Sequence, residues 1–399
     1  MGSFVSLSVE RMELDWGKNH SINNFSEIFK PEDECDMPYY YADGVMEMRP
    51  GMSRKLSSVA KRLDLLGFSE NELPKKFAKT IDAMPEIQED FPLTFEQFSL
   101  VMRSIDLSKA FQFFEEEGSG YELGEYISAY LFQDPEVKKH LPPNIQISKE
   151  TGAYFENFEP FLLLRLLALN QENMDRSVQW RFSEVIDGGW IDHEELIYPL
   201  PSESRILIVT EGKSDTFVIK RTIEELYPDI SDFFDFVDMK ENYPFTGTGS
   251  LLNFCQGLSR IKIQNKVIVL FDNDAVGVEA YNKATQLVRP KSMVTCLLPS
   301  HTDFESVTTI GPSGINKENI NGSAVAIECF LDWKQQEGSQ YLVRWNSFNS
   351  SQGKYQGAIE NKDELVRDFK KGNLSDGTYD TSKLRYLINH LLKEWIKAQ

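Results

Sequence analysis

Two aliphatic segments, each followed by acidic residues, dominate the stretch from Arg205 to Gly277. The first is Arg205-Ile206-Leu207-Ile208-Val209-Thr210, followed by Glu211-Gly212-Lys213-Ser214-Asp215; the second is Lys266-Val267-Ile268-Val269-Leu270-Phe271, followed by Asp272-Asn273-Asp274-Ala275-Val276-Gly277. Uninterrupted aliphatic runs that lead into a glycine-bearing turn and a helical pattern are typical of buried parallel strands. We therefore predict an α/β domain built on a parallel sheet.

The acidic residues of this stretch come directly after the two predicted strands. In parallel α/β sheets, ligand sites lie beyond the carboxyl ends of the strands, where the strand-to-helix turns gather. Carboxylates drawn to one point raise one another's pKa unless a cation lies between them, and Mg²⁺ and Mn²⁺ prefer such oxygen ligands. Glu211, Asp215, Asp272 and Asp274 are therefore predicted to form a divalent-metal site.

The composition is that of a folded protein with an acidic surface. The 399 residues are 41% hydrophobic, which allows two or three domains with a sizeable core. Four scattered cysteines without a Cys-x-x-Cys pair favour reduced thiols in a cytoplasmic protein. No run approaches the ~20 apolar residues of a membrane span, so we expect no membrane contact. Because the net charge of −20 repels polyanions, any nucleic acid must bind a local basic face.

The sequence predicts three regions. Residues 1–85 combine strand patterns with an amphipathic helix, which indicates a small α+β unit; residues 86–202 have helical periodicity; residues 203–399 contain the parallel sheet. Thr94 and Gln97 have the spacing of a capping box at a helix start. The expected elements are strands at 4–9, 12–16 and 293–298, helices at 52–66 and 383–397, and a hairpin of 341–345 with 354–359.

Two further residues are candidates for the same site. Glu328 lies in the apolar stretch 322–331, where a lone carboxylate is costly unless it is paired or bound to a metal. Glu328 is therefore the third acidic candidate, after the two groups that follow the strands. Lys354 is either a cation that neutralises phosphate at the site or an exposed strand lysine.

The strand-end motifs resemble a known family. Val209-Thr210-Glu211-Gly212-Lys213-Ser214-Asp215, together with Leu270-Phe271-Asp272-Asn273-Asp274-Ala275-Val276-Gly277, is similar to the Toprim domain shared by topoisomerases, primases and OLD-type nucleases. The aspartate that follows Glu-Gly-x-x resembles the OLD type. By this resemblance, Glu328 corresponds to the additional metal ligand of that family.

The first region carries a second resemblance. Its opening at 2–16, the Pro38-Tyr39-Tyr40-Tyr41 stretch and the segment 53–59 resemble the N-terminal domain that is fused to HEPN or Toprim modules in bacterial defence proteins. Together the two resemblances imply a nuclease that acts on RNA, such as tRNA, or on DNA, as a toxic effector of antiphage defence.

The Toprim resemblance also implies a role for each site residue. Asp272 and Asp274 would hold the principal Mg²⁺ or Mn²⁺ ion. Glu211 would act as general base or acid, and with Asp215 and Glu328 it would bridge a second ion. Lys213 would neutralise the scissile phosphate. Two such ions clamp the attacking and leaving oxygens of a phosphodiester during hydrolysis.

Other hypotheses stay open at this point. Arg385 and His390 fit the Arg-x4–6-His spacing of HEPN ribonucleases. A primase-like or topoisomerase-like Toprim enzyme is an alternative within enzymes, and a non-catalytic regulatory or scaffold subunit of a defence complex is an alternative outside them. Besides nucleic acid, the partners considered are a regulatory or sensor protein and a second copy of the chain. The choice between RNA and DNA is left open.

Overall fold

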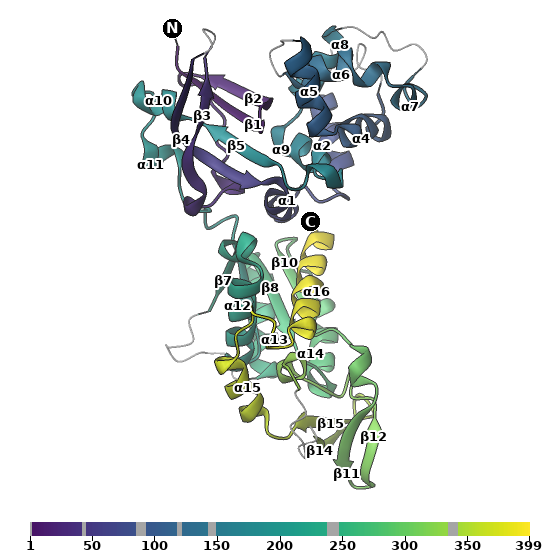
Figure 1. Cartoon of the computed structure of the whole chain (residues 1–399). Helices are drawn as coiled ribbons and strands as arrows, with labels where there is room; N and C mark the ends of the chain where they lie inside the picture. The colour runs from purple at the N-terminus through teal and green to yellow at the C-terminus, as the bar shows by residue number, and fades with distance from the viewer. Residues whose placement is uncertain are drawn as a thin grey trace. The chain divides into compact units, whose positions relative to one another are not determined.

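The computed structural model describes residues 2–41, 45–84, 93–117, 122–142, 149–237, 247–333 and 342–399 (Figure 1). The chain divides into two compact units, Met1–Pro201 and Ser202–Gln399. The boundary that the sequence suggests between residues 85 and 86 lies inside the first unit, because the helices after it pack into the same hydrophobic core as the first strands.

The first unit is built on an antiparallel sheet with strand order β2-β1-β5-β4-β3. Its central strand, β5, comes from the region that the sequence analysis predicted to be helical. In the sheet, Trp180 of β5 pairs with Leu7 on one side and Met52 on the other, and all three side chains are buried. The strands are β1 (Phe4–Val9), β2 (Met12–Lys18), β3 (Glu34–Tyr40), β4 (Met46–Lys55) and β5 (Ser177–Arg181).

The helix predicted over residues 52–66 is shorter than expected. Residues 52–55 belong to β4, and α1 begins only at Leu56. The prediction was wrong for these four residues because they pair with β5, from Met52 opposite Trp180 to Lys55 opposite Ser177. In a strand, alternate side chains lie on the same face, and here Met52 and Arg54 are both buried on one face of the sheet. This burial outweighs the helical pattern of the local sequence.

Helices pack around this sheet and extend the core. Thr94 and Gln97 form the predicted capping box, since the Gln97 N–H donates to Thr94 Oγ1 at 3.3 Å and the Thr94 N–H donates to Gln97 Oε1 at 3.0 Å. The helices are α1 (Leu56–Leu65), α2 (Leu73–Ala83), α4 (Phe95–Ser104), α5 (Leu107–Glu117), α6 (Leu123–Ala129), α7 (Pro135–Lys138), α8 (Lys149–Ala153), α9 (Pro160–Leu167), α10 (Ser183–Asp187) and α11 (His193–Leu196).

The second unit contains the predicted parallel sheet. Its strand order is β10-β8-β6-β7, and every neighbouring pair is parallel. The side chains of β8 are buried on both faces of the sheet, as the uninterrupted aliphatic run predicted. The strands are β6 (Ile206–Val209), β7 (Phe234–Phe236), β8 (Lys266–Phe271) and β10 (Met293–Leu297), and the helices between them are α12 (Lys213–Leu226), α13 (Thr248–Ile261) and α14 (Ala275–Thr285).

The remaining elements of the second unit are a hairpin, further short strands and two helices. The predicted hairpin is β14 (Val343–Asn349) with β15 (Lys354–Ile359), and residue 341 lies outside the described residues. The other elements are β9 (Asn273–Asp274), β11 (Val307–Gly311), β12 (Gly314–Glu318), β13 (Ala324–Val325), α15 (Lys362–Lys371) and α16 (Ser382–Ala398), the last being the predicted closing helix. In the part of the chain that the structure describes, no helix is both long and apolar enough to cross a membrane.

Candidate functional site

Neighbouring strands bring the first two acids of the site together. β6 and β8 pair in register from Ile206 opposite Lys266 to Val209 opposite Val269, so both strands end at the same edge. Glu211 follows β6 and Asp272 follows β8. The Asp272 backbone N–H donates to Glu211 Oε1 at 3.1 Å, which joins the two strand ends directly.

A second hydrogen bond fixes the Glu211 side chain. The Thr248 hydroxyl, at the first residue of α13, donates to Glu211 Oε2 at 2.6 Å. Burial raises the pKa of Glu211, and the charge of Asp274 adds to the rise, whereas the hydrogen bonds from Thr248 and from the Asp272 N–H oppose it. Each Glu211 oxygen therefore has a donor, and the carboxylate is held at the edge of the sheet.

The pKa values of Asp272 and Asp215 are also raised, by burial and by neighbouring carboxylates. Burial has the largest effect on Asp272 and raises its pKa well above the ordinary value; the charges of Asp215, Glu211, Asp274 and Glu328 raise it further. Burial also raises the pKa of Asp215 to about 7, with Glu328 as the strongest of the charged neighbours that act on it. The four other acids predicted from the sequence thus all act electrostatically on Asp272.

Asp274 has a structural role at the start of α14. Its Oδ1 accepts the Gly277 N–H at 2.7 Å, and its Oδ2 accepts a hydrogen bond from the Gln356 amide of β15. This turn requires glycine at position 277, because a Cβ there would lie 2.1 Å from the Asp272 carbonyl oxygen. The Asp-x-Asp motif therefore positions α14 as well as supplying two carboxylates.

Glu328 reaches the site through a short strand pairing. β13 pairs antiparallel with β9, with Ala324 opposite Asp274, and a 3₁₀ helix at Ile327–Phe330 follows. The Glu328 residue is only 7% exposed. Its charge raises the pKa values of both Asp215 and Asp272, so it belongs to the same acidic group.

The two candidate lysines begin different elements of the second unit. Lys213 is the first residue of α12 and is exposed. Lys354, the first residue of β15, has its Nζ 3.1 Å from the position that a Cβ would occupy on Gly322, and Gly322 precedes Ser323, which bridges to Asp274. Lys213 thus lies between Glu211 and Asp215 in the chain, and Lys354 lies beside the segment that bridges to Asp274.

Sequence reasoning missed Thr248 and Gln356. Both donate to candidate carboxylates, yet Thr248 follows a segment outside the described residues and Gln356 lies in a hairpin more than eighty positions from its partner, Asp274. The only sequence signal for Thr248 is its place in the repeat Thr246-Gly247-Thr248-Gly249. Nothing near Gln356 indicates its contact, because tertiary packing alone creates it.

The HEPN alternative does not form a compact pair. Arg385 and His390 both lie on α16, where residues five apart point about 140° away from each other. Arg385 is exposed, and its guanidinium lies 6.0 Å from the centre of the Tyr227 ring. Burial lowers the pKa of His390. The helix therefore points the two side chains in different directions.

Comparison with known families concerns the first half of the chain. The model of the HEPN/Toprim N-terminal domain 1 matches residues 1–204. The chain belongs to the HEPN/Toprim N-terminal domain 1 family. This is a nuclease-related family, and it confirms the resemblance of the first region. No curated protein and no solved structure matches the chain.

The acidic group lies outside the part of the chain that defines the HEPN/Toprim N-terminal family. Its donors are all carboxylate oxygens, which is the chemistry that Mg²⁺ and Mn²⁺ prefer. Among the described residues, however, no three His, Cys, Asp or Glu side chains are already arranged to hold one metal ion. The carboxylates thus suit a divalent ion, because their oxygens are the ligands it prefers and their mutual repulsion would be relieved by a cation. In this structure, however, two hydrogen bonds hold the Glu211 carboxylate away from an arrangement that could bind the ion.

Proposed function

We propose that this chain is a divalent-metal-dependent nuclease that hydrolyses phosphodiester bonds in RNA or DNA. The observation that carries the proposal is the gathering of four carboxylates around Asp272 at the carboxyl end of β8. Five acids at one edge of a sheet destabilise a protein unless a cation offsets their repulsion. Membership of a nuclease-related family adds independent support.

The proposed roles follow from the surroundings of each acid. Glu211 is the general base or acid, because burial raises its pKa and two hydrogen bonds orient its carboxylate. Asp272 and Asp274 hold the principal ion, and Asp215 and Glu328 hold a second ion together with Glu211. Bound Mg²⁺ or Mn²⁺ would stabilise the charge that develops on the attacking and leaving oxygens.

Binding of the second ion would require Glu211 to release either the Thr248 hydroxyl or the Asp272 N–H, because both of its oxygens accept hydrogen bonds. Asp274 would keep its bond to Gly277 and offer a remaining lone pair to the principal ion. Lys213, at the exposed start of α12, is proposed to neutralise the phosphate that is cut.

A cleavage assay tests the proposal. Purified protein is incubated with total tRNA and with plasmid DNA in Mg²⁺, Mn²⁺ or EDTA, beside the variants Glu211→Gln and Asp272→Ala. We expect the wild type to cut one substrate class, and we expect EDTA and both variants to abolish the cleavage. Glu305→Gln is the matched control, because it removes an exposed acid of the same unit that is not among the groups acting on Asp272. Full activity in Asp272→Ala refutes the assignment.

A second candidate is a non-catalytic subunit that scaffolds a larger complex. The observation that favours it is that no three candidate ligands in the described residues are arranged around one point. Metal titration separates the two candidates. A scaffold shows no Mn²⁺-dependent change in melting temperature, whereas a nuclease is stabilised by about 2.7 kcal/mol at a hundredfold excess of metal over Kd.

We further propose that the nuclease is a toxic effector of antiphage defence that acts in the cytoplasm. The support is the family of the first unit together with a nuclease-type acidic group in the second. Expression in bacterial cells tests the idea. We expect the wild type to arrest growth, with or without phage infection as the trigger, and Glu211→Gln to be harmless; equal growth of both under infection refutes it.

A further inference from the structure

The first unit contains a cavity of about 1170 Å³ that the proposed nuclease chemistry does not use. It opens on the polar face of the five-stranded sheet, opposite the hydrophobic core. Its wall combines aromatic rings with charged side chains of both signs. Among the lining residues are the aromatics Phe4, Trp16, Tyr39 and Tyr40, the acids Glu13 and Glu122, and the cations Lys18, Arg49 and Arg181.

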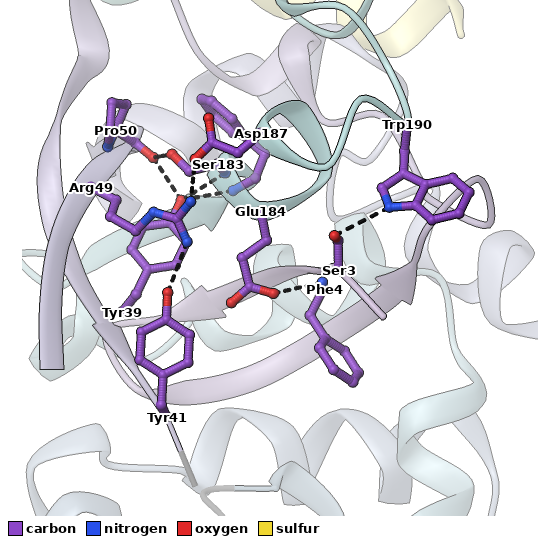
Figure 2. Close-up of polar contacts among 11 residues, drawn as sticks. Ser3, Phe4, Tyr39, Tyr41, Arg49, Pro50, Ser183, Glu184, Asp187 and Trp190 are labelled. Atoms are coloured by element: carbon purple, nitrogen blue, oxygen red, sulfur yellow. Dashed lines mark hydrogen bonds and ion pairs between the residues drawn. The ribbon is translucent and has the colours of Figure 1, made fainter. Parts of the chain in front are cut away.

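Part of the wall is held rigidly, as Figure 2 shows. The Tyr39 hydroxyl accepts the N–H groups of Phe182 and Ser183 at 2.9 and 3.0 Å and donates to the Pro50 carbonyl at 2.6 Å. Arg49 donates to the Tyr41 hydroxyl at 2.8 Å. These bonds fix one wall before any ligand arrives, which lowers the entropic cost of binding.

The wall also carries a large exposed ring. Trp16, on the edge strand β2, is 61% exposed, and its ring lies at 6.3 Å from that of Phe4. Cations of the chain already lie against other rings of the cavity, with Lys18 Nζ 5.3 Å from the centre of Phe4 and Arg49 5.6 Å from the centre of Tyr39. The rings of this cavity are therefore suited to cation–π contacts.

The cavity also brings carboxylates together. Glu13 and Glu122 pair in a parallel β-bridge, which places the two residues side by side although they are far apart in sequence. Both also line an adjoining cavity of about 340 Å³, together with Asp15 and Glu156. Within the described residues, Asn23 donates to Asp15 and the Gly124 N–H donates to Glu156, whereas no group donates to the Glu13 carboxylate.

The electrostatic potential at Glu13 is negative. Burial raises the pKa of Glu13 to about 7, and the charges of Glu122, Glu156 and Asp15 raise it further, while Arg181 is the cation that opposes them. Arg181 uses its donors on neutral acceptors of the sheet, among them the Ser8 hydroxyl at 2.7 Å and the Pro38 carbonyl at 2.9 Å. It therefore compensates the four acids only in part.

We propose that this cavity binds an organic cation with an alkylammonium or guanidinium head. The head pairs with the carboxylates of Glu13 and Glu122, and the body of the ligand lies against the ring of Trp16. A nucleotide fits this site less well, because its phosphates would face Glu13 and Glu122 where the cationic head is proposed to lie. The site belongs to the family domain, residues 1–204.

Isothermal titration calorimetry of the full chain tests the proposal, with spermidine and agmatine as free cations, a doubly blocked arginine tripeptide as the polypeptide source, and AMP as a planar anion. We expect saturable one-to-one binding of at least one cation and none of AMP. Tighter binding of the tripeptide identifies a basic peptide as the source, and tighter binding of the free amines identifies a small metabolite. Either result supports the shared chemistry.

Variants distinguish the site from general attraction to an acidic protein. Glu13→Gln, Glu122→Gln and Trp16→Leu are each expected to weaken binding roughly tenfold. Glu172→Gln removes an exposed acid that lines neither cavity and is expected to leave Kd unchanged. Circular dichroism confirms that each variant is folded, and Glu122 and Trp16 are exposed enough to be replaced without unfolding. Equal losses in Glu172→Gln and Glu13→Gln, no saturable binding, or a preference for AMP overturns the proposal.

Discussion

Replacing Asp272 by asparagine separates repulsion within the acidic group from metal binding. The four charged groups with the largest effect on the Asp272 pKa are all carboxylates. At pH 7.5 the metal-free wild type must either keep a proton on this acid or accept the repulsion. An asparagine side chain of the same size carries no charge, so it needs no added proton and is not repelled by the neighbouring carboxylates. At an effective dielectric constant near 20, this should increase the free energy of unfolding by roughly 1 to 2 kcal/mol. We therefore expect metal-free Asp272→Asn to melt at a higher temperature than the wild type.

Adding Mn²⁺ should reverse the order. A hundredfold excess of metal over Kd stabilises the wild type by about 2.7 kcal/mol. For a unit of about 200 residues, this raises the melting temperature by roughly 5 to 10 °C. Asp272→Asn should gain less than about 2 °C, because it has lost a principal ligand.

Differential scanning fluorimetry over a Mn²⁺ titration, with EDTA as the metal-free reference, measures both effects. Glu305→Gln removes one exposed acid of the same unit and should keep the full metal-dependent rise. A metal-free variant that is less stable than the wild type, together with an undiminished Mn²⁺ response, would refute the reasoning, since the acids would then neither repel one another nor bind the ion.

Three further predictions rest on single contacts. A Cβ on Gly277 would lie 2.1 Å from the Asp272 carbonyl oxygen, so Gly277→Ala should lower the free energy of unfolding in urea by about 2 kcal/mol. Gly257→Ala is the control, because a Cβ there meets open space in α13, and it should raise the free energy of unfolding by up to about 1 kcal/mol. Equal effects of the two variants would contradict the close approach at Gly277. The folded-state pKa of Glu13 is raised from 4.5 to about 7, so its stabilising effect is complete below pH 4.5 and is lost as the pH rises through 7. Partial exposure reduces this effect to about 1 to 2 kcal/mol, and Glu13→Gln should flatten the pH dependence of urea unfolding between pH 5 and 8; an unchanged slope counts against it. Tyr39→Phe leaves two backbone N–H groups without their acceptor, so it should lower the free energy of unfolding in urea by about 2 kcal/mol. A loss under about 0.5 kcal/mol would show that water replaces these hydrogen bonds.

The parallel sheet and its acids were predictable because the signals are local. An aliphatic run that ends in Glu-Gly or Asp-x-Asp specifies a buried strand, a turn and a helix start within a dozen residues. The structure confirms β6, β8 and the proximity of Glu211 to Asp272. Even Glu328 was visible from sequence, because a carboxylate in an apolar stretch needs a special environment.

Features that depend on distant pairing were not predictable in the same way. β5 is only five residues long, and its burial pattern is meaningful only once β1 and β4 lie on its two sides. The contact between Gln356 and Asp274 likewise depends on where the hairpin folds back. Residues 52–55, the first four of the predicted helix, pair with β5 instead, and this pairing could not be predicted for the same reason.

The order in which the ribosome makes this chain determines when its first sheet can form. β1 with β2 and β3 with β4 can form two hairpins early, but β5 joins them only after residue 181 has been synthesised. At ordinary translation rates this delay is on the order of ten seconds. During that time the edges of β1 and β4 are open to pairing with other chains. Slow translation between β4 and β5 should therefore increase aggregation of the nascent protein and its need for chaperones.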